Sequence, residues 1–90
     1  MSERLRLRDA DLVWRAADGE VVALDLHESE YLAVNVSGKI LWEALGRGTT
    51  RACLVQCLID EYALSPEAAE RDTDAFLAEL QRRGLLDRVG

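Results

Sequence analysis

The residues that most often carry chemistry are few in this chain and poorly placed for it. Cys53 and Cys57 stand four positions apart on a predicted helix, a spacing that could supply two ligands of a metal site. No third or fourth soft ligand is evident, because the only histidine, His27, lies in a predicted turn elsewhere. A disulfide within a regular helix at this spacing is geometrically awkward. We therefore interpret both cysteines as small residues that face or flank the core, and we predict no metal site.

Nucleophilic catalysis and phosphate binding are not indicated either. Ser37 and Ser65 stand where predicted helices begin and are interpreted as caps, so no Ser/His/Asp arrangement can be argued around Ser29 and His27. The segment Gly46-Arg47-Gly48 has no strand before it and no Lys-Ser/Thr pair after it, which predicts a turn between helices and not a phosphate loop. We predict that the chain has no catalytic residue and no cofactor, and that it is not an enzyme.

Length and composition exclude several further classes of protein. The 90 residues suffice for one domain, and 49% hydrophobic with 31% charged residues is typical of an ordinary globular chain. The segment Met1 to Arg8 is too charged for a signal peptide, and no apolar run approaches the roughly 20 residues of a membrane helix. The sequence predicts a single cytoplasmic domain over residues 1–90 with no membrane partner.

The charge pattern favours a protein or peptide partner over a nucleic acid. The formal net charge is −6, whereas affinity for a phosphate backbone comes largely from clustered Lys and Arg. Only Arg82-Arg83 and the alternating Arg4, Arg6 and Arg8 form groups. We expect no nucleic-acid partner.

Three strands are predicted in the first part of the chain, over Leu12–Arg15, Glu20–Leu26 and Glu30–Val34. The pair Asp18-Gly19 between two β-prone runs is a strong hairpin signal, and the short link 27–29 favours a three-stranded antiparallel meander. The second strand alternates, so one of its faces is expected to be buried and the other partly solvated. Val22, Leu24 and Leu26 are expected on one face, and Val21, Ala23 and Asp25 on the other.

Three helices are predicted to follow, over Ser37–Leu45, over Arg51–Tyr62, and from Ser65-Pro66-Glu67 to Gly84. The expected N-caps are Ser37, Thr49 or Thr50, and Ser65. After Gly84, Leu85-Leu86 is expected to turn back onto the domain, as a short strand. Both tryptophans, Trp14 and Trp42, are interpreted as core residues. The order predicts an α+β domain of the winged-helix kind, with a three-stranded antiparallel sheet followed by three helices.

One surface of this predicted fold is suited to binding a peptide. The third strand lies at an edge of the sheet, and an edge strand is ready to pair with another chain. The third helix has a core stripe of Ala69, Thr73, Phe76, Leu77 and Leu80. A second stripe flanks it and consists of Asp72, Ala75, Phe76, Glu79 and Arg83. If the flanking stripe borders the third strand, strand and helix form a groove.

These segments together resemble the PqqD-like family, whose members are recognition elements for the leader peptides of ribosomally made, post-translationally modified peptides (RiPPs). The resemblance rests on apolar positions in a fixed order, from about Leu12 to Leu86. They are Tyr31-Leu32-Ala33-Val34-Asn35, Ile40-Leu41 with Leu45, Gly48-Thr49-Thr50, Leu58-Ile59-x-x-Tyr62, and Asp72-x-x-x-Phe76-Leu77-x-x-Leu80-x-x-x-Gly84-Leu85-Leu86. The segment Val36 to Lys39 departs from the family pattern of small residues and acids.

The resemblance implies a non-catalytic adaptor that binds a precursor's leader peptide. The leader would add as a further strand to the third strand and lie against the third helix. The chain is most similar to the discrete leader-binding B proteins of lasso-peptide clusters, which implies delivery of the leader to a transglutaminase-like leader peptidase. The lasso cyclase is a further candidate partner. The implied peptide-binding residues are Glu30, Tyr31, Leu32, Ala33, Val34, Asp72, Ala75, Phe76, Glu79, Leu80 and Arg83.

Two alternatives stay open at this point. The chain could be the peptide chaperone of pyrroloquinoline quinone (PQQ) biosynthesis, which serves a radical SAM enzyme. It could also be a winged-helix DNA-binding regulator, although the acidic third helix would repel phosphates.

Along the third helix, Asp72, Glu79 and Arg83 form an acidic-to-basic gradient, which predicts a basic leader residue near Asp72 and an acidic one near Arg83.

Overall fold

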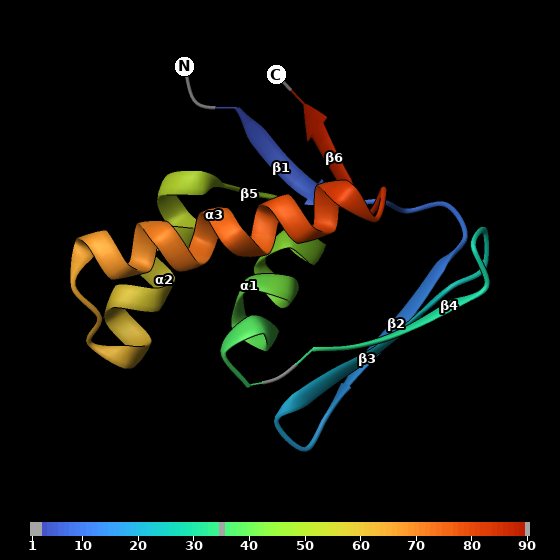
Figure 1. Cartoon of the computed structure of the whole chain (residues 1–90), viewed down its shortest axis with the longest axis horizontal. Coiled ribbons are helices and arrows are strands. Elements are labelled where there is room, and N and C mark those ends of the chain that lie inside the picture. The colour runs from blue at the N-terminus through green and yellow to red at the C-terminus, as the bar shows by residue number, and fades with distance from the viewer. Residues whose placement is uncertain (1–2, 35, 90) are drawn as a thin grey trace.

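The computed structural model describes residues 3–34 and 36–89, and Asn35 of the family pattern lies outside them (Figure 1). It consists of two three-stranded antiparallel sheets and three helices, which confirms the predicted α+β class. The elements are β1 (Arg4–Leu7), β2 (Leu12–Ala17), β3 (Glu20–Asp25), β4 (Glu30–Val34), α1 (Val36–Arg47), β5 (Thr49–Thr50), α2 (Arg51–Tyr62), α3 (Pro66–Arg82) and β6 (Leu86–Val89).

The predicted meander is present as a sheet of strand order β2-β3-β4. The β2–β3 turn has φ of 47° at Asp18 and 81° at Gly19, the positive values that two-residue hairpin loops require. Strand β3 pairs with β4 from Val21 opposite Val34 to Asp25 opposite Glu30. Strand β3 ends at Asp25, one residue earlier than predicted, because residues 26–29 form the turn into β4.

The two faces of this sheet have different surroundings. Val21, Ala23 and Asp25 of β3 are buried, as is Val34 of β4, so this face packs toward the helices. The opposite face leaves Leu24 42% exposed, and Leu26 beyond the strand end is 52% exposed. Of the two predicted faces of β3, the buried one is therefore the less hydrophobic face, which carries Asp25.

A second sheet, of strand order β5-β1-β6, was not predicted. No strand was predicted before Leu12, whereas β1 pairs with β6 from Arg4 opposite Val89 to Leu7 opposite Leu86. Leu5 and Leu7 point into the core and are 2% and 6% exposed. The pairing brings the two ends of the chain together (Figure 1). The expected return of Leu85-Leu86 as a strand is confirmed, with β6 beginning at Leu86.

Most of the predicted helix signals are confirmed. The Thr50 hydroxyl accepts from the Cys53 N–H at 3.2 Å, and the Ser65 hydroxyl accepts from the Ala68 N–H at 3.2 Å. The predicted N-cap Ser37 is wrong, because α1 already begins at Val36 and Ser37 is therefore its second residue. Among the described residues, no helix combines the length and apolar character needed to cross a membrane.

Gly46 lies in the last turn of α1 and not in the predicted turn between helices. A glycine costs a helix about 1 kcal/mol relative to alanine, so its presence needs a reason. A Cβ at Gly46 would lie 2.9 Å from Cζ2 of Trp14, which is closer than carbon atoms normally approach. Trp14 in turn packs edge-on against the fully buried Trp42, with ring centroids 6.0 Å apart. Gly46 therefore makes room for β2 to close over α1.

An ion pair joins the two halves of the fold. The Arg8 guanidinium, at the end of β1, donates to Oδ1 of Asp25 at 2.5 Å and to the carbonyl of Gly84 at 3.1 Å. The same Asp25 oxygen accepts the N–H groups of His27 and Glu28 in the β3–β4 turn. These contacts connect β1, the hairpin turn and the end of α3, three segments that are far apart in the sequence.

This arrangement predicts that acid weakens the fold through Asp25. Burial raises the pKa of Asp25, but hydrogen bonds from Arg8, Glu28 and His27 outweigh it and hold the pKa below 3.8. A lowered folded-state pKa gives stability that is complete above the unfolded-state value and is lost as pH falls through the folded one. We expect thermal melts at successive pH values to show this loss progressively as the pH falls below about 5.

The Asp25→Asn variant should melt about 5 °C or more lower at pH 7 and should show a smaller change with pH than the wild type. Asp9→Asn, at an exposed carboxylate on the adjoining loop, is the matched control and should leave the curve unchanged. Equal pH curves for Asp25→Asn and the wild type would contradict the role assigned to this pair.

Candidate binding groove

A groove of about 560 Å³ lies between the hairpin sheet and the helices. Strand β4 forms one wall and α3 the other, with α1 and α2 beneath them. The residues predicted for the site that line it are Leu32, Ala33, Val34, Asp72, Ala75, Phe76, Glu79 and Leu80. The structure thus brings together eight residues from two segments that are about 40 positions apart in the sequence.

The strand wall has one side free for pairing. Within the described residues, β4 pairs with β3 only, so it is an edge strand of the hairpin sheet. Within the described chain, the backbone N–H and C=O groups on the other side of β4 pair with no strand. Residues of the same strand line the groove. Val34 is 8% exposed and anchors the strand in the core, while Ala33 is exposed.

The helix wall consists of residues at helical spacing. Asp72, Ala75, Phe76, Glu79 and Leu80 recur every three or four positions along α3 and so share one side of it. Leu80 is 2% exposed, and Phe76 is half-buried against the core cluster. This wall is apolar at its base and carries carboxylates at its rim.

The residues at the base of the groove were not predicted from the sequence. The further lining residues are Gly38, Leu41, Leu58, Tyr62 and Leu64. Leu58 and Tyr62 belong to the segment Leu58-Ile59-x-x-Tyr62 of the family pattern, but nothing in that segment indicates that the end of α2 opens into a groove. Their position depends on the crossing of α2 and α3, which the sequence pattern does not specify.

Glu30 and Arg83 stand beyond the end of the groove and connect its walls. An Arg83 Nη1 lies 3.5 Å from Oε2 of Glu30 on β4, and Arg83 Nε donates to Oε2 of Glu79 at 2.7 Å. Arg82 also donates to Glu79. Hydrogen bonds from Arg82 and Arg83 lower the pKa of Glu79 to about 2, so this carboxylate is ionised at any physiological pH.

These contacts change one expectation about charge. The sequence analysis expected Arg83 to attract an acidic leader residue, but its charge is already compensated by Glu79 and Glu30. Asp72 is exposed at the other end of the groove, and its ion pair with Arg71 is long, at 3.8 Å. The groove therefore presents a negative end at Asp72 and a nearly neutral end at Arg83.

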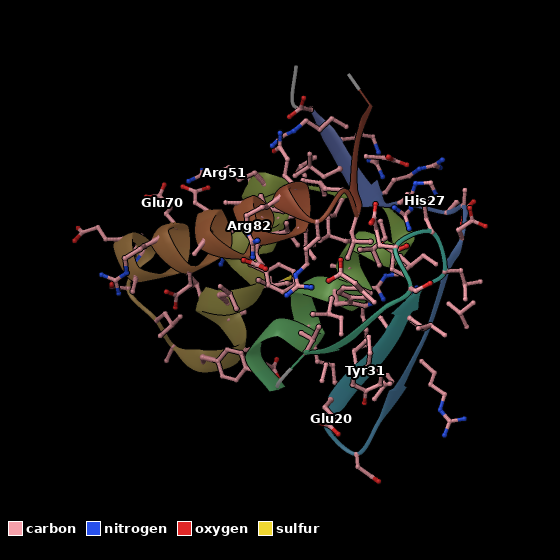
Figure 2. The ribbon with its side chains drawn as sticks, turned by 45° about the vertical axis from the view of Figure 1, so that its right-hand side comes forward. Glu20, His27, Tyr31, Arg51, Glu70 and Arg82 are labelled. Carbon is pink, nitrogen blue, oxygen red and sulfur yellow. The ribbon has the colours of Figure 1, made fainter. Side chains whose placement is uncertain are left out.

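Tyr31 does not line the groove. It is 67% exposed on the face of the sheet that points away from the helices, and Figure 2 shows it on the hairpin sheet, away from Arg51 and Glu70 on the helices. A residue next to a strand edge can still contact an added strand from that outer face, because cross-strand neighbours stand about 5 Å apart.

The geometry does not support the chemical roles that were considered for the two cysteines and His27. The cysteines were predicted to face or flank the core; Cys57 is half-buried, and Cys53 is exposed and does not face it. His27 lies in the hairpin turn as predicted (Figure 2). Among the described residues, no three His, Cys, Asp or Glu side chains are grouped so that they could hold a metal ion. Asp74 is held by Arg51 at 2.7 Å, so part of the acidic face of α3 is compensated within the chain.

The chain is similar to known proteins over nearly its whole length. The family model described as coenzyme PQQ synthesis protein D (PqqD) matches residues 20–86. A solved structure described as TbiB1 in complex with the TbiA(beta) leader peptide is 28% identical with a TM-score of 0.84, over 91% of this chain and 94% of that one. Another, described as lasso peptide synthetase B1 complexed with the leader peptide, is 29% identical with a TM-score of 0.80, over 92% and 96%. No curated protein matches at a significant level.

Proposed function

Because this chain belongs to the PqqD family, we propose that it is a RiPP recognition element that binds the leader segment of a precursor peptide in the groove between β4 and α3. The observation that carries the proposal is the position of this groove along an unpaired strand edge. Both similar structures were determined with a leader peptide bound, which supports the same class of ligand here. The proposed role is that of an adaptor without catalysis of its own.

We propose that the leader binds by adding a strand to β4. A peptide strand could pair with the free backbone groups of β4, which would give affinity without regard to its sequence. Selectivity would come from side chains that enter the apolar base between Phe76 and Leu58. The groove is open along the strand, so it suits an extended segment better than a compact small molecule.

The support for a lasso-type precursor comes from the solved structures. Each match covers more than nine-tenths of both chains, and one of them is a lasso peptide synthetase. Delivery of a peptide to a radical SAM enzyme in PQQ biosynthesis remains the alternative, since the family model is named after that pathway. A DNA-binding role is disfavoured, because Glu67, Glu70 and Asp72 are exposed on α3 and would repel phosphates.

We further propose that the outer face of the hairpin sheet contacts the maturation enzyme, in the first instance a leader peptidase and then the cyclase. Val13, Leu24 and Tyr31 are direct cross-strand neighbours on β2, β3 and β4, and they are 60%, 42% and 67% exposed. An apolar row of this extent on a small domain indicates an interaction surface. A leader strand added to β4 would extend the same sheet.

The first prediction concerns leader binding and its mode. Titration calorimetry should find a Kd between about 1 μM and 1 nM for the leader peptide and no comparable affinity for the core peptide. Leaders with one backbone amide N-methylated at a time should lose affinity at every second position across the bound segment, because a strand pairs through alternate residues. A loss of affinity that does not alternate along the leader would contradict strand addition. Equal affinity for the leader and core peptides would contradict it as well.

The groove variants give the second prediction. Phe76→Ala should weaken leader binding by about 2 kcal/mol, roughly thirtyfold, because it removes the largest apolar side chain of the helix wall. Asp72→Lys should weaken the binding of a leader with a basic residue at that end by about 1 kcal/mol or less, since the pair is exposed. Glu70→Lys makes the same charge change outside the groove and serves as the control. Circular dichroism would verify that each variant is folded.

The third prediction separates enzyme contact from leader binding. Leu24→Ser and Val13→Ser change side chains on the outer sheet face, so leader affinity should stay within twofold of the wild type. Each variant is mixed with the precursor and the peptidase that processes it, and the rate of leader removal is measured. This rate should fall about tenfold or more, as expected when an apolar contact residue is lost. Unchanged processing by both variants would show that the enzyme contacts another surface.

A further inference from the structure

Three arginines line a small cavity between β1 and the end of α1. The cavity has a volume of about 170 Å³ and is lined by Arg4, Leu5 and Arg6 of β1, by Arg47 at the end of α1, and by Gly48. It shares no residue with the groove between β4 and α3. Arg4 and Arg6 alternate with the buried Leu5 and Leu7, so both point to the outer face of β1.

These arginines lack the carboxylate partners that most other arginines of the chain have. Within residues 3–34 and 36–89, Arg4, Arg6 and Arg47 form no ion pair or side-chain hydrogen bond, whereas Arg8, Arg51, Arg71, Arg82, Arg83 and Arg88 each form an ion pair with an acid. Asp87 stands opposite Arg6 in the β1–β6 register, but no ion pair joins these two described residues. Three uncompensated like charges thus stand together in a chain of net charge −6.

Gly48 contributes to the shape of this cluster. Its φ of +87° ends α1, and a Cβ at this position would lie 3.2 Å from Nη2 of Arg4. The absence of a side chain lets the Arg4 guanidinium lie against the backbone beside Arg47. The three cations line one cavity, so an anion bound between them would relieve their mutual repulsion.

We propose that Arg4, Arg6 and Arg47 form a binding site for a small phosphoryl anion, such as inorganic phosphate, pyrophosphate or the phosphate end of a nucleotide. Guanidinium groups bind phosphate oxygens through paired N–H donors, and three of them match a multiply charged anion better than a single carboxylate. The cavity is too small for an extended polymer. The overall negative charge and the exposed acids of α3 also disfavour a nucleic acid. This site is independent of the leader-binding proposal.

Cys53 provides a reporter beside the site. A hydrogen bond from the Thr50 hydroxyl is the main cause that lowers the pKa of the Cys53 thiol, and the positive charge of Arg4 contributes as well. An anion bound to Arg4 would cancel part of that charge. Occupancy should therefore raise the pKa of Cys53 and slow its alkylation at a fixed pH, without any change in the groove.

The test is a titration of the full chain with pyrophosphate, followed by calorimetry and by the rate of Cys53 alkylation in a Cys57→Ala background. We expect saturable binding of pyrophosphate that is tighter than that of phosphate, with slower alkylation at saturation. Arg6→Gln and Arg47→Gln should each weaken binding about tenfold, whereas Arg15→Gln, at an exposed arginine without an ion pair on β2, should not.

Each of the remaining outcomes would overturn the proposal. An equal loss of pyrophosphate affinity in the Arg15→Gln variant would show that binding depends only on the net charge of the chain. Binding of a DNA duplex in preference to pyrophosphate would identify a nucleic-acid surface, and tighter binding of acetate than of phosphate would indicate a carboxylate partner. The absence of saturable binding to the folded wild type, with leader affinity intact, would exclude the site while leaving the proposed function in place.

Discussion

The ion pair between Arg8 and Asp25 is the contact on which the geometry of the groove depends. Strand β1 and helix α3 belong to the helical half of the fold, and β4 belongs to the hairpin sheet. Arg8 joins these halves because it donates both to Asp25 and to the Gly84 carbonyl at the end of α3. Asp25 in turn orders the turn that leads into β4. This largely buried ionic network thus acts together with the apolar core and the Glu30–Arg83 ion pair to hold the strand edge at its distance from the helix.

Local signals in the sequence predicted most elements and most of the groove. Asp18-Gly19 predicts the hairpin because few other pairs adopt two positive φ angles, and Thr50 and Ser65 predict helix starts because their hydroxyls accept free N–H groups. The helical spacing from Asp72 to Leu80 placed one wall of the groove, and the edge position of β4 placed the other. Each of these inferences needs only a few neighbouring residues, so none depends on knowing the rest of the fold.

The features that were missed depend on contacts between distant segments. Strand β1 has the alternation of a half-buried strand, but its partner β6 is about 80 residues away, so four residues near the terminus gave no evidence of pairing. Gly46 is typical of a turn in sequence, and only the approach of Trp14 explains why it lies within a helix. The compensation of Arg83 by Glu30 could not be foreseen either, because it requires the end of α3 to stand beside the start of β4.

The central claim is that a leader peptide becomes the next strand of the hairpin sheet beside β4. Amide hydrogen exchange of β4, measured residue by residue by NMR with and without leader peptide, tests it most directly. The amides of β4 that do not face β3 should exchange fast in the free protein and become protected when the leader binds, so that protection alternates along residues 30–34. New protection on β2 or β6, with the exchange of β4 unchanged, would show that the leader binds at another edge and would contradict the account.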